Sequence, residues 1–273
     1  MPVPSSYIDK WLYSTIVLLK NKREVVHTDR KVVKVPEWGK DFIEIWHPGS
    51  EERAAKDIPG IVKLLNLSKP VKILDCPCGW GRFSNPLAEL GHKVTGIDID
   101  KASIEMAKAN SPKNNPPDFR VGDMRKFKID EEYDVILNLY GSFGYFDRKT
   151  DYRVLTGFVD GLKQGGQLMI DQSNWEKVIR FPKRIWYELP NGKKCLKEQS
   201  VDLTKGIYWV RNTIISETQE RVMELTMNWY TVSEYRNMLE KLGIKDFRFY
   251  GNFDGSEYSV DSERQIVVAI KDK

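Results

Sequence analysis

Residues 71–82 read V-K-I-L-D-C-P-C-G-W-G-R, and this stretch decides the fold of the 273-residue chain. It opens with a short apolar run, of the type that forms a strand buried on both faces, and the carboxylate of Asp75 stands at its end. A turn with Gly79 and Gly81 follows, and then a predicted helix over residues 83–90. The glycines let a ligand approach the backbone closely, and the helix N-terminus offers unpaired N–H groups at the same point. The stretch therefore predicts a nucleotide-type site at the edge of a parallel sheet.

Two classes of nucleotide ligand use a turn of this kind. The dinucleotide fingerprint G-x-G-x-x-G needs a third glycine, and Ser84 stands in its place. Asp75 lies four residues before Gly79, where its charge would repel a pyrophosphate and attract a cation. The sequence therefore disfavours an NAD oxidoreductase and favours a positively charged cofactor.

Further acids stand where later strands are expected to end. Asp98 closes a predicted strand over residues 93–98, where an acid accepts hydrogen bonds from ribose hydroxyls. Asp123 follows a third strand over residues 118–122. A fourth strand over residues 133–140 opens into a loop rich in glycine and aromatic residues, so this loop should also lie at the ligand edge of the sheet.

The remaining chain predicts two additions to this sheet. Residues 1–69 form an N-terminal helical or lid segment, with a helix over residues 51–67 that Pro59 should kink or divide. After a fifth strand over residues 167–171, residues 174–228 alternate in polarity and contain the turn signal Asn191-Gly192, which predicts an antiparallel β insertion covering the site.

The C-terminal part is expected to complete the sheet, so residues 70–173 and 229–273 would form one cofactor-binding domain. Thr231 and Glu234 make a capping box that opens a helix over residues 231–242. Strands are predicted over residues 244–250 and 265–270, and the last one should insert antiparallel between strands five and six.

Composition sets loose limits on partners. The formal net charge is +4, which neither requires nor excludes nucleic acid. Cys76, Cys78 and Cys195 make no disulfide framework and have no metal-ligand spacing, so we expect a reducing cytoplasm and no metal. Residues 11–19 are apolar but too short to span a bilayer, so no membrane partner is expected.

The run D-x-x-C-G-x-G resembles motif I of the class I (Rossmann-like) S-adenosylmethionine-dependent methyltransferases. The run N-L-x-x-S-F-G-Y-F from Asn138 resembles the end of strand four in their broad small-molecule-type branch. The resemblance implies an α/β fold with a seven-stranded, mostly parallel, doubly wound sheet, and S-adenosylmethionine as cofactor with S-adenosylhomocysteine as product. Trp80 departs from the family pattern, which has a small residue there. The cofactor-binding residues that it implies are Asp75, Cys78, Gly79, Gly81, Asp98, Ile99, Asp123, Met124, Asn138 and Leu139.

The implied reaction is in-line transfer of the sulfonium methyl to a nitrogen or oxygen atom of a small molecule. Because sulfonium is a good leaving group, positioning and desolvation can supply most of the catalysis. A hydroxyl or ammonium acceptor also needs a base, for which Tyr140, Asp171 and His47 are candidates. The candidate substrate-binding residues are Trp46, Tyr140, Tyr145, Asn174, Trp175 and Tyr230.

Two alternatives to a small-molecule methyltransferase remain. Residues 1–40 hold eight Lys or Arg against four acids, which would suit RNA or protein as acceptor; nucleic acid is possible but not favoured. A non-catalytic protein that only binds S-adenosylmethionine would carry the same motifs. A monomer or a homodimer fits the sequence equally well.

Overall fold

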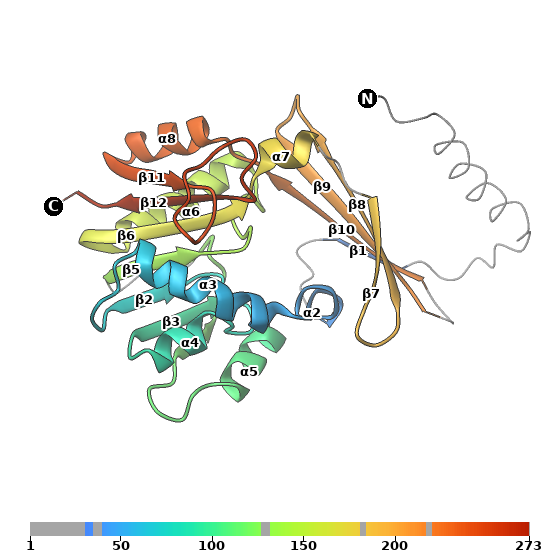
Figure 1. The fold of residues 1–273 in the computed structure, drawn as a ribbon, viewed down its shortest axis with the longest axis horizontal. Coiled ribbons are helices and arrows are strands. Elements are labelled where there is room, and N and C mark those ends of the chain that lie inside the picture. Colours follow the sequence, from blue (N-terminus) through green and yellow to red (C-terminus); the bar gives the residue numbers. More distant parts are fainter. Residues whose placement is uncertain (1–30, 35–39, 127–131, 181–183, 217–219, 273) are drawn as a thin grey trace, which may run out of the picture.

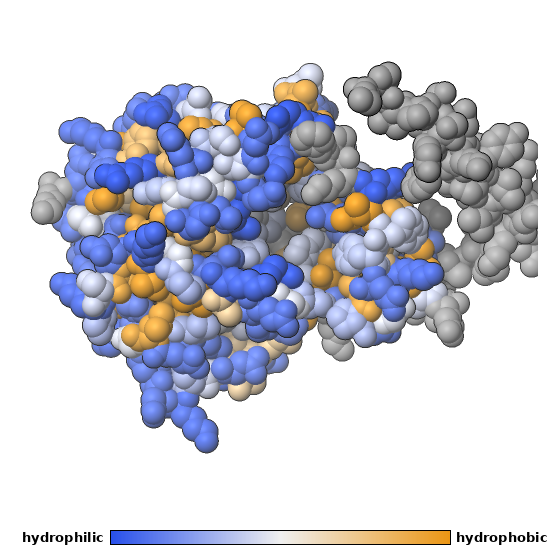
Figure 2. Space-filling view, viewed as in Figure 1, coloured by the Kyte–Doolittle hydropathy of each residue, from blue (hydrophilic) through white to orange (hydrophobic). Residues whose placement is uncertain are grey.

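The computed structural model describes residues 31–34, 40–126, 132–180, 184–216 and 220–272. They form two sheets (Figure 1). A seven-stranded sheet has the order β11-β12-β6-β5-β2-β3-β4, and a five-stranded sheet has the order β1-β10-β9-β8-β7. Figure 2 shows this side of the molecule, where hydrophilic residues predominate and hydrophobic ones lie between them.

The seven-stranded sheet confirms the predicted fold class and strand order. The five strands from β2 to β6 are parallel, whereas β12 pairs antiparallel with both β6 and β11. Alternate residues of β5 enter two different hydrophobic clusters, because Ile136 packs on one face and Val135 and Leu137 pack on the other. The strands are β2 (Lys72–Asp75), β3 (Lys93–Asp98), β4 (Asp118–Val121), β5 (Tyr133–Asn138), β6 (Leu162–Ser173), β11 (Asp246–Tyr250) and β12 (Arg264–Ile270).

Helices cover both faces of this sheet, as the doubly wound fold requires (Figure 1). Apolar residues of α3 (Ser50–Leu64) and α4 (Ser84–Glu89) join one cluster. Those of α6 (Arg148–Asp160) and α8 (Val232–Lys241) join the other. The predicted capping box is present at α8. Ile104 and Ala107 of α5 (Lys101–Ala109) pack with Cys78 and Phe119.

One helix prediction is wrong in detail. Pro59 lies inside α3, which continues through it instead of ending there and starting again. Neighbouring Gly60 lies against the C-terminal loop, where an added Cβ would come within 2.2 Å of the Phe253 carbonyl oxygen. Packing of α3 on the sheet therefore outweighs the missing hydrogen bond at the proline.

The five-stranded sheet, called the insertion sheet below, follows β6. It contains β7 (Arg184–Glu188), β8 (Lys194–Asp202), β9 (Ile207–Ile215) and β10 (Glu220–Asn228), which pair antiparallel. Strands were expected from Trp175 onward, but the segment begins instead with a short helix, α7 (Trp175–Arg180). The Asn174 side chain caps it, since Asn174 Oδ1 accepts from the Glu176 N–H at 3.1 Å.

The N-terminal part of the chain contributes to the insertion sheet. The backbone of β1 (Lys31–Lys34) pairs parallel with β10, which the sequence did not predict. Then α2 (Lys40–Trp46) lies between the two sheets (Figure 1). Glu44 of α2 ties the helix to the insertion sheet, because it accepts hydrogen bonds from Asn191, Lys193 and Arg221.

Candidate active site

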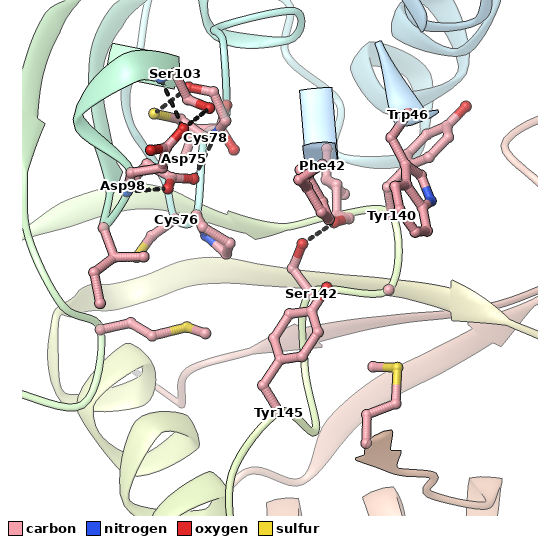
Figure 3. A pocket seen from close by; sticks show the side chains of 18 of the residues that line it. Phe42, Trp46, Asp75, Cys76, Cys78, Asp98, Ser103, Tyr140, Ser142 and Tyr145 are labelled. Atoms are coloured by element: carbon pink, nitrogen blue, oxygen red, sulfur yellow. Dashed lines mark hydrogen bonds between the residues drawn. The ribbon is translucent and has the colours of Figure 1, made fainter. Parts of the chain in front are cut away.

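A cavity of about 340 Å³ lies at the carboxyl ends of the parallel strands, within the size range of small-molecule sites. The loops after β2, β3, β4 and β5 line one side. Phe42 and Trp46 of α2 and several residues of the insertion sheet line the other. Figure 3 shows Asp75, Asp98 and Ser103 together on one side and Phe42, Trp46 and Tyr140 across from them.

Asp98 is oriented by the backbone. Its Oδ2 accepts from the Gly79 N–H and its Oδ1 accepts from the Asp100 N–H, each at 2.8 Å. Each carboxylate oxygen keeps a further lone pair. Burial raises the pKa of Asp98, and these backbone hydrogen bonds oppose that rise. Asp98 therefore joins the glycine turn to the end of β3 and can still accept hydrogen bonds from a ligand in the cavity.

The two glycines of the turn serve different purposes. Gly79 has a φ of 54°, and a Cβ there would meet no protein atom within 4 Å, so the missing side chain leaves room in the cavity. Gly81 has a φ of 80°, but a Cβ there would lie 2.8 Å from the Phe119 ring and 3.0 Å from Ala107. Gly81 is thus required for packing of the turn on α5 and β4.

Asp75 is 2% exposed and accepts a hydrogen bond from Ser84 Oγ at 2.6 Å. Burial raises its pKa to about 7, although this hydrogen bond and the charge of Arg82 oppose the rise. A cationic ligand in the cavity would stabilise the ionised form. The charge that Asp75 can offer to such a ligand is therefore lost as the pH falls through 7.

We expect the affinity for S-adenosylmethionine to fall about tenfold between pH 8 and pH 6, because the ionised fraction of Asp75 falls by that factor. Calorimetric titrations across this range measure it. Asp75→Asn, which keeps a partner for Ser84, is the control and should flatten the profile. An equally steep profile in the variant would assign the pH dependence to another group, on the protein or on the ligand.

Tyr140 follows β5 in a left-handed conformation with a φ of 58°, which is uncommon for a bulky residue. Its ring lies between two guanidinium groups, with Arg82 Cζ 3.9 Å and Arg264 Cζ 4.3 Å from the ring centroid. Its hydroxyl donates to Asp57 Oδ2 at 2.5 Å, and burial together with this bond raises its pKa to about 12. A phenol held in this way positions neighbouring groups and is a poor base near neutral pH.

Arg82 is a site residue that the motif reading passed over, although it directly follows the glycine turn. It lines the cavity, and burial lowers its pKa. Its guanidinium stacks near Trp80, Phe83 and Tyr140. Within the described residues, no group forms a hydrogen bond or ion pair with it. A buried cation in this state can bind an anionic ligand group, since guanidinium pairs well with carboxylate.

The opposite side of the cavity is apolar. Trp175 of α7 and four residues of the insertion sheet line it, and we call these five the apolar wall: Trp175, Tyr208, Val210, Leu225 and Met227. Trp175 and Tyr208 lie with ring centroids 4.7 Å apart, and Tyr145 packs against this cluster. Lys197 of β8 also lines the cavity beside the wall.

The structure brings most of the predicted site residues to this one cavity. From the cofactor set, all except Gly81 and Asn138 line it. Asn138 lies behind the lining, fully buried, and donates to the Cys76 carbonyl at 2.9 Å. Trp46, Tyr140, Tyr145 and Trp175 of the predicted substrate set also line it.

The other predicted residues lie outside the cavity lining and have structural partners. Asp171 is fully buried and pairs with Arg264, and its Oδ2 accepts from the Tyr140 N–H at 2.8 Å. His47 pairs with Glu51 at 2.8 Å. Asn174 donates to the carbonyls of residues 259 and 262, and Tyr230 donates to Asp151 at 2.9 Å. Neither Asp171 nor His47 is thus placed to take a proton from an acceptor in this cavity.

Comparisons with known proteins agree with this arrangement. Residues 73–166 match the family model for a methyltransferase domain. The putative methyltransferase YqeM of Bacillus subtilis is 28% identical over 229 residues, covering 77% of this chain and 89% of the relative. The CcbJ methyltransferase of Streptomyces caelestis has a similar structure, with a TM-score of 0.69 at 17% identity over 87% of this chain and 94% of CcbJ.

A third similar structure was solved with its cofactor. CalS10 of Micromonospora echinaspora, described as an amino pentose methyltransferase with bound S-adenosylmethionine, has a TM-score of 0.63 at 14% identity over 86% of this chain and 98% of CalS10. The strand order and the cavity at the strand ends are those of a class I methyltransferase. With the matching domain model and relative, they identify the chain as an S-adenosylmethionine-dependent methyltransferase. Every helix in the described ranges is too short or too polar to cross a bilayer.

Proposed function

We propose that this enzyme transfers a methyl group from S-adenosylmethionine to a nitrogen or oxygen atom of a small-molecule acceptor. The supporting observation is a single cavity with four acids and a glycine turn on one side and the apolar wall on the other. A cavity enclosed in this way suits a small acceptor better than a nucleic acid or a folded protein. CalS10, which has the same fold, is described as acting on an amino pentose.

The residues present fit the cofactor. Gly79 leaves the room that a close ligand needs, and the cavity offers the Asp98 carboxylate to ribose hydroxyls. Ile99, Asp123 and Met124 line the adjoining region, where we place the adenine. We assign the methionine carboxylate to Arg82 and its ammonium to the neighbourhood of Asp75. When bound, the cofactor supplies an electrophilic methyl group.

The chain contributes chiefly by positioning and exclusion of water. Phe42 and Trp46 of α2 stack at 4.8 Å and close the cavity toward the insertion sheet. Tyr140 is fixed by its contacts with Arg82, Arg264 and Asp57, and thus supports the cofactor side of the cavity. No side chain need hold a proton if the acceptor binds as a neutral amine.

We further propose a division of labour along the chain. Residues 70–173 and 229–273 bind the cofactor, and residues 174–228 supply the wall for the acceptor. Cys76, Cys78 and Cys195 are buried free thiols, which suits a reducing compartment such as the cytoplasm.

The direct test is incubation with S-adenosylmethionine and a panel of small amines and alcohols, with S-adenosylhomocysteine and methylated product measured by mass spectrometry. Product from members of this panel would support the proposal. Cofactor binding without product from small molecules, RNA or protein would favour a binding protein. Product from RNA or protein alone, with binding that falls steeply with salt, would favour the macromolecular alternative.

Arg82→Leu tests the assignment of the carboxylate. We expect it to weaken S-adenosylmethionine at least about tenfold, because a charge-assisted pair is lost. Methylthioadenosine, which lacks the carboxylate, is the matched ligand and should bind the variant and the wild type alike. Equal weakening of both ligands would show that Arg82 only supports the fold of the turn.

A further inference from the structure

We propose that the methyl acceptor carries a carboxylate, and that Lys197 and Asn212 of the insertion sheet bind it while its apolar body lies on the apolar wall. The inference rests on the proposed function, because it concerns the acceptor side of the same cavity. It adds the chemical class of the acceptor and two residues that the sequence analysis did not select.

The register of the insertion sheet places these residues together. Lys197 of β8 lies directly opposite Asn212 of β9, which in turn lies opposite Met223 of β10. Residues directly opposite in antiparallel strands project to the same face, and alternate residues of one strand share a face. Asn212 therefore shares its face with Tyr208 and Val210, which line the cavity, as Lys197 also does.

Asn212 is a buried amide without a partner. Its side chain is fully buried, and neither Oδ1 nor Nδ2 forms a hydrogen bond with any part of the chain that the structure describes. Such a group is costly in a folded protein, because it has lost water and gained nothing in return. Its two neighbours, Val210 along the strand and Lys197 across it, both line the cavity. A ligand oxygen at this point would accept the hydrogen bond that Nδ2 lacks.

The charge of this region also suits an anion. The aspartates that line the cavity, Asp75, Asp98, Asp100 and Asp123, all lie on the cofactor side. The acids nearest to Lys197 and Asn212 along the sheet are Glu198 and Glu224. Both belong to the opposite face of the sheet and pair there with Arg184 and Arg211. The acceptor side thus presents one ammonium among apolar groups.

A carboxylate matches this pair in size and charge. One oxygen can accept from the Lys197 ammonium and the other from Asn212 Nδ2, which satisfies both donors with a single negative charge. A phosphate dianion has three oxygens and would need more donors than the two that this face offers. The expected acceptor is therefore an aromatic or aliphatic amine or hydroxyl compound that bears a carboxylate at the end opposite to the reacting atom.

The test uses matched probes on the full chain saturated with S-adenosylhomocysteine. The probes are 3-phenylpropionate, its carboxamide and phenethyl phosphate, titrated by calorimetry. We expect the wild type to bind the carboxylate at least about tenfold more tightly than either other probe. Lys197→Met should reduce this preference to less than about twofold. Lys194→Met, an exposed lysine on the other face of the same strand, should leave it unchanged.

Asn212→Leu separates a binding role from a structural one. Replacing an unpartnered buried amide by an apolar group of similar volume should raise the melting temperature of the ligand-free protein. The same variant should lose most of the preference for the carboxylate. A lower melting temperature would show that the amide has a structural role and would overturn its assignment.

The outcomes also distinguish this inference from the proposed function. Absence of any carboxylate preference in the wild type, or its persistence in Lys197→Met, would overturn the inference while S-adenosylhomocysteine still binds. A protein that binds neither S-adenosylmethionine nor S-adenosylhomocysteine would instead overturn the proposed function. In each variant, unchanged affinity for S-adenosylhomocysteine shows that the cofactor side is intact.

Discussion

Replacing Arg264 with methionine is expected to lower the free energy of unfolding by about 3–5 kcal/mol, because it leaves a buried carboxylate without its counter-ion. Asp171 is 0% exposed, and Arg264 pairs with both of its oxygens, Nε donating to Oδ1 at 2.5 Å. The Arg264 guanidinium also lies over the Tyr140 and Phe253 rings, 4.3 and 5.1 Å from their centroids. Urea unfolding followed by circular dichroism measures the loss.

Two further variants make this experiment specific to the ion pair. The double variant Asp171→Leu with Arg264→Met should recover much of the stability, because removing both charges leaves no uncompensated ion. Arg248→Met, an exposed residue of the adjacent strand β11, should change stability by less than about 0.5 kcal/mol. If Arg264→Met costs no more than Arg248→Met, then water reaches Asp171 and the pair is not a structural requirement.

Asp98→Ala is expected to weaken S-adenosylmethionine about 100-fold. The variant loses two acceptors for the ribose hydroxyls, each hydrogen bond to a charged group being worth roughly 1.5–3 kcal/mol. It also releases the Gly79 N–H, which Asp98 holds at 2.8 Å, so the glycine turn loses its fixed position. Calorimetric titration of the variant and the wild type measures the change.

The control for this variant is a nearby acid outside the cavity. Asp118 of β4 is exposed and pairs with Arg120, so Asp118→Ala should bind the cofactor as the wild type does. NAD should bind neither protein, since Asp75 repels a pyrophosphate. Retention of wild-type affinity in Asp98→Ala would remove the ribose assignment, and the cofactor would then have to bind elsewhere in the cavity.

The central sheet could be predicted from the sequence because its signals are local. Each parallel strand is a short apolar run that ends in an acid or a glycine, and the Thr231 capping box marks the start of α8 directly. The ends of parallel strands meet at one edge, so Asp75, Asp98 and Asp123 could be placed at one cavity before any coordinates.

The rest depends on contacts between distant residues. The sequence before Trp175 gives no strong helix signal, because α7 is capped by Asn174, whose amide is held by the loop 259–262. The role of Asp171 depends on Arg264, 93 residues away. Arg82 was passed over because a single arginine after a glycine turn looks like a surface residue until the burial around it is known.

The pairing of β1 with β10 has a consequence for the exchange of substrate specificity between enzymes of this fold. Residues 174–228 look in the sequence like a cassette that could be cut out and replaced. The sheet they form nevertheless takes its edge strand from residues 31–34, and Glu44 of α2 is anchored on three of its donors. A functional graft would therefore have to carry two separate pieces of chain, and recombination at a single pair of crossover points would break the acceptor wall.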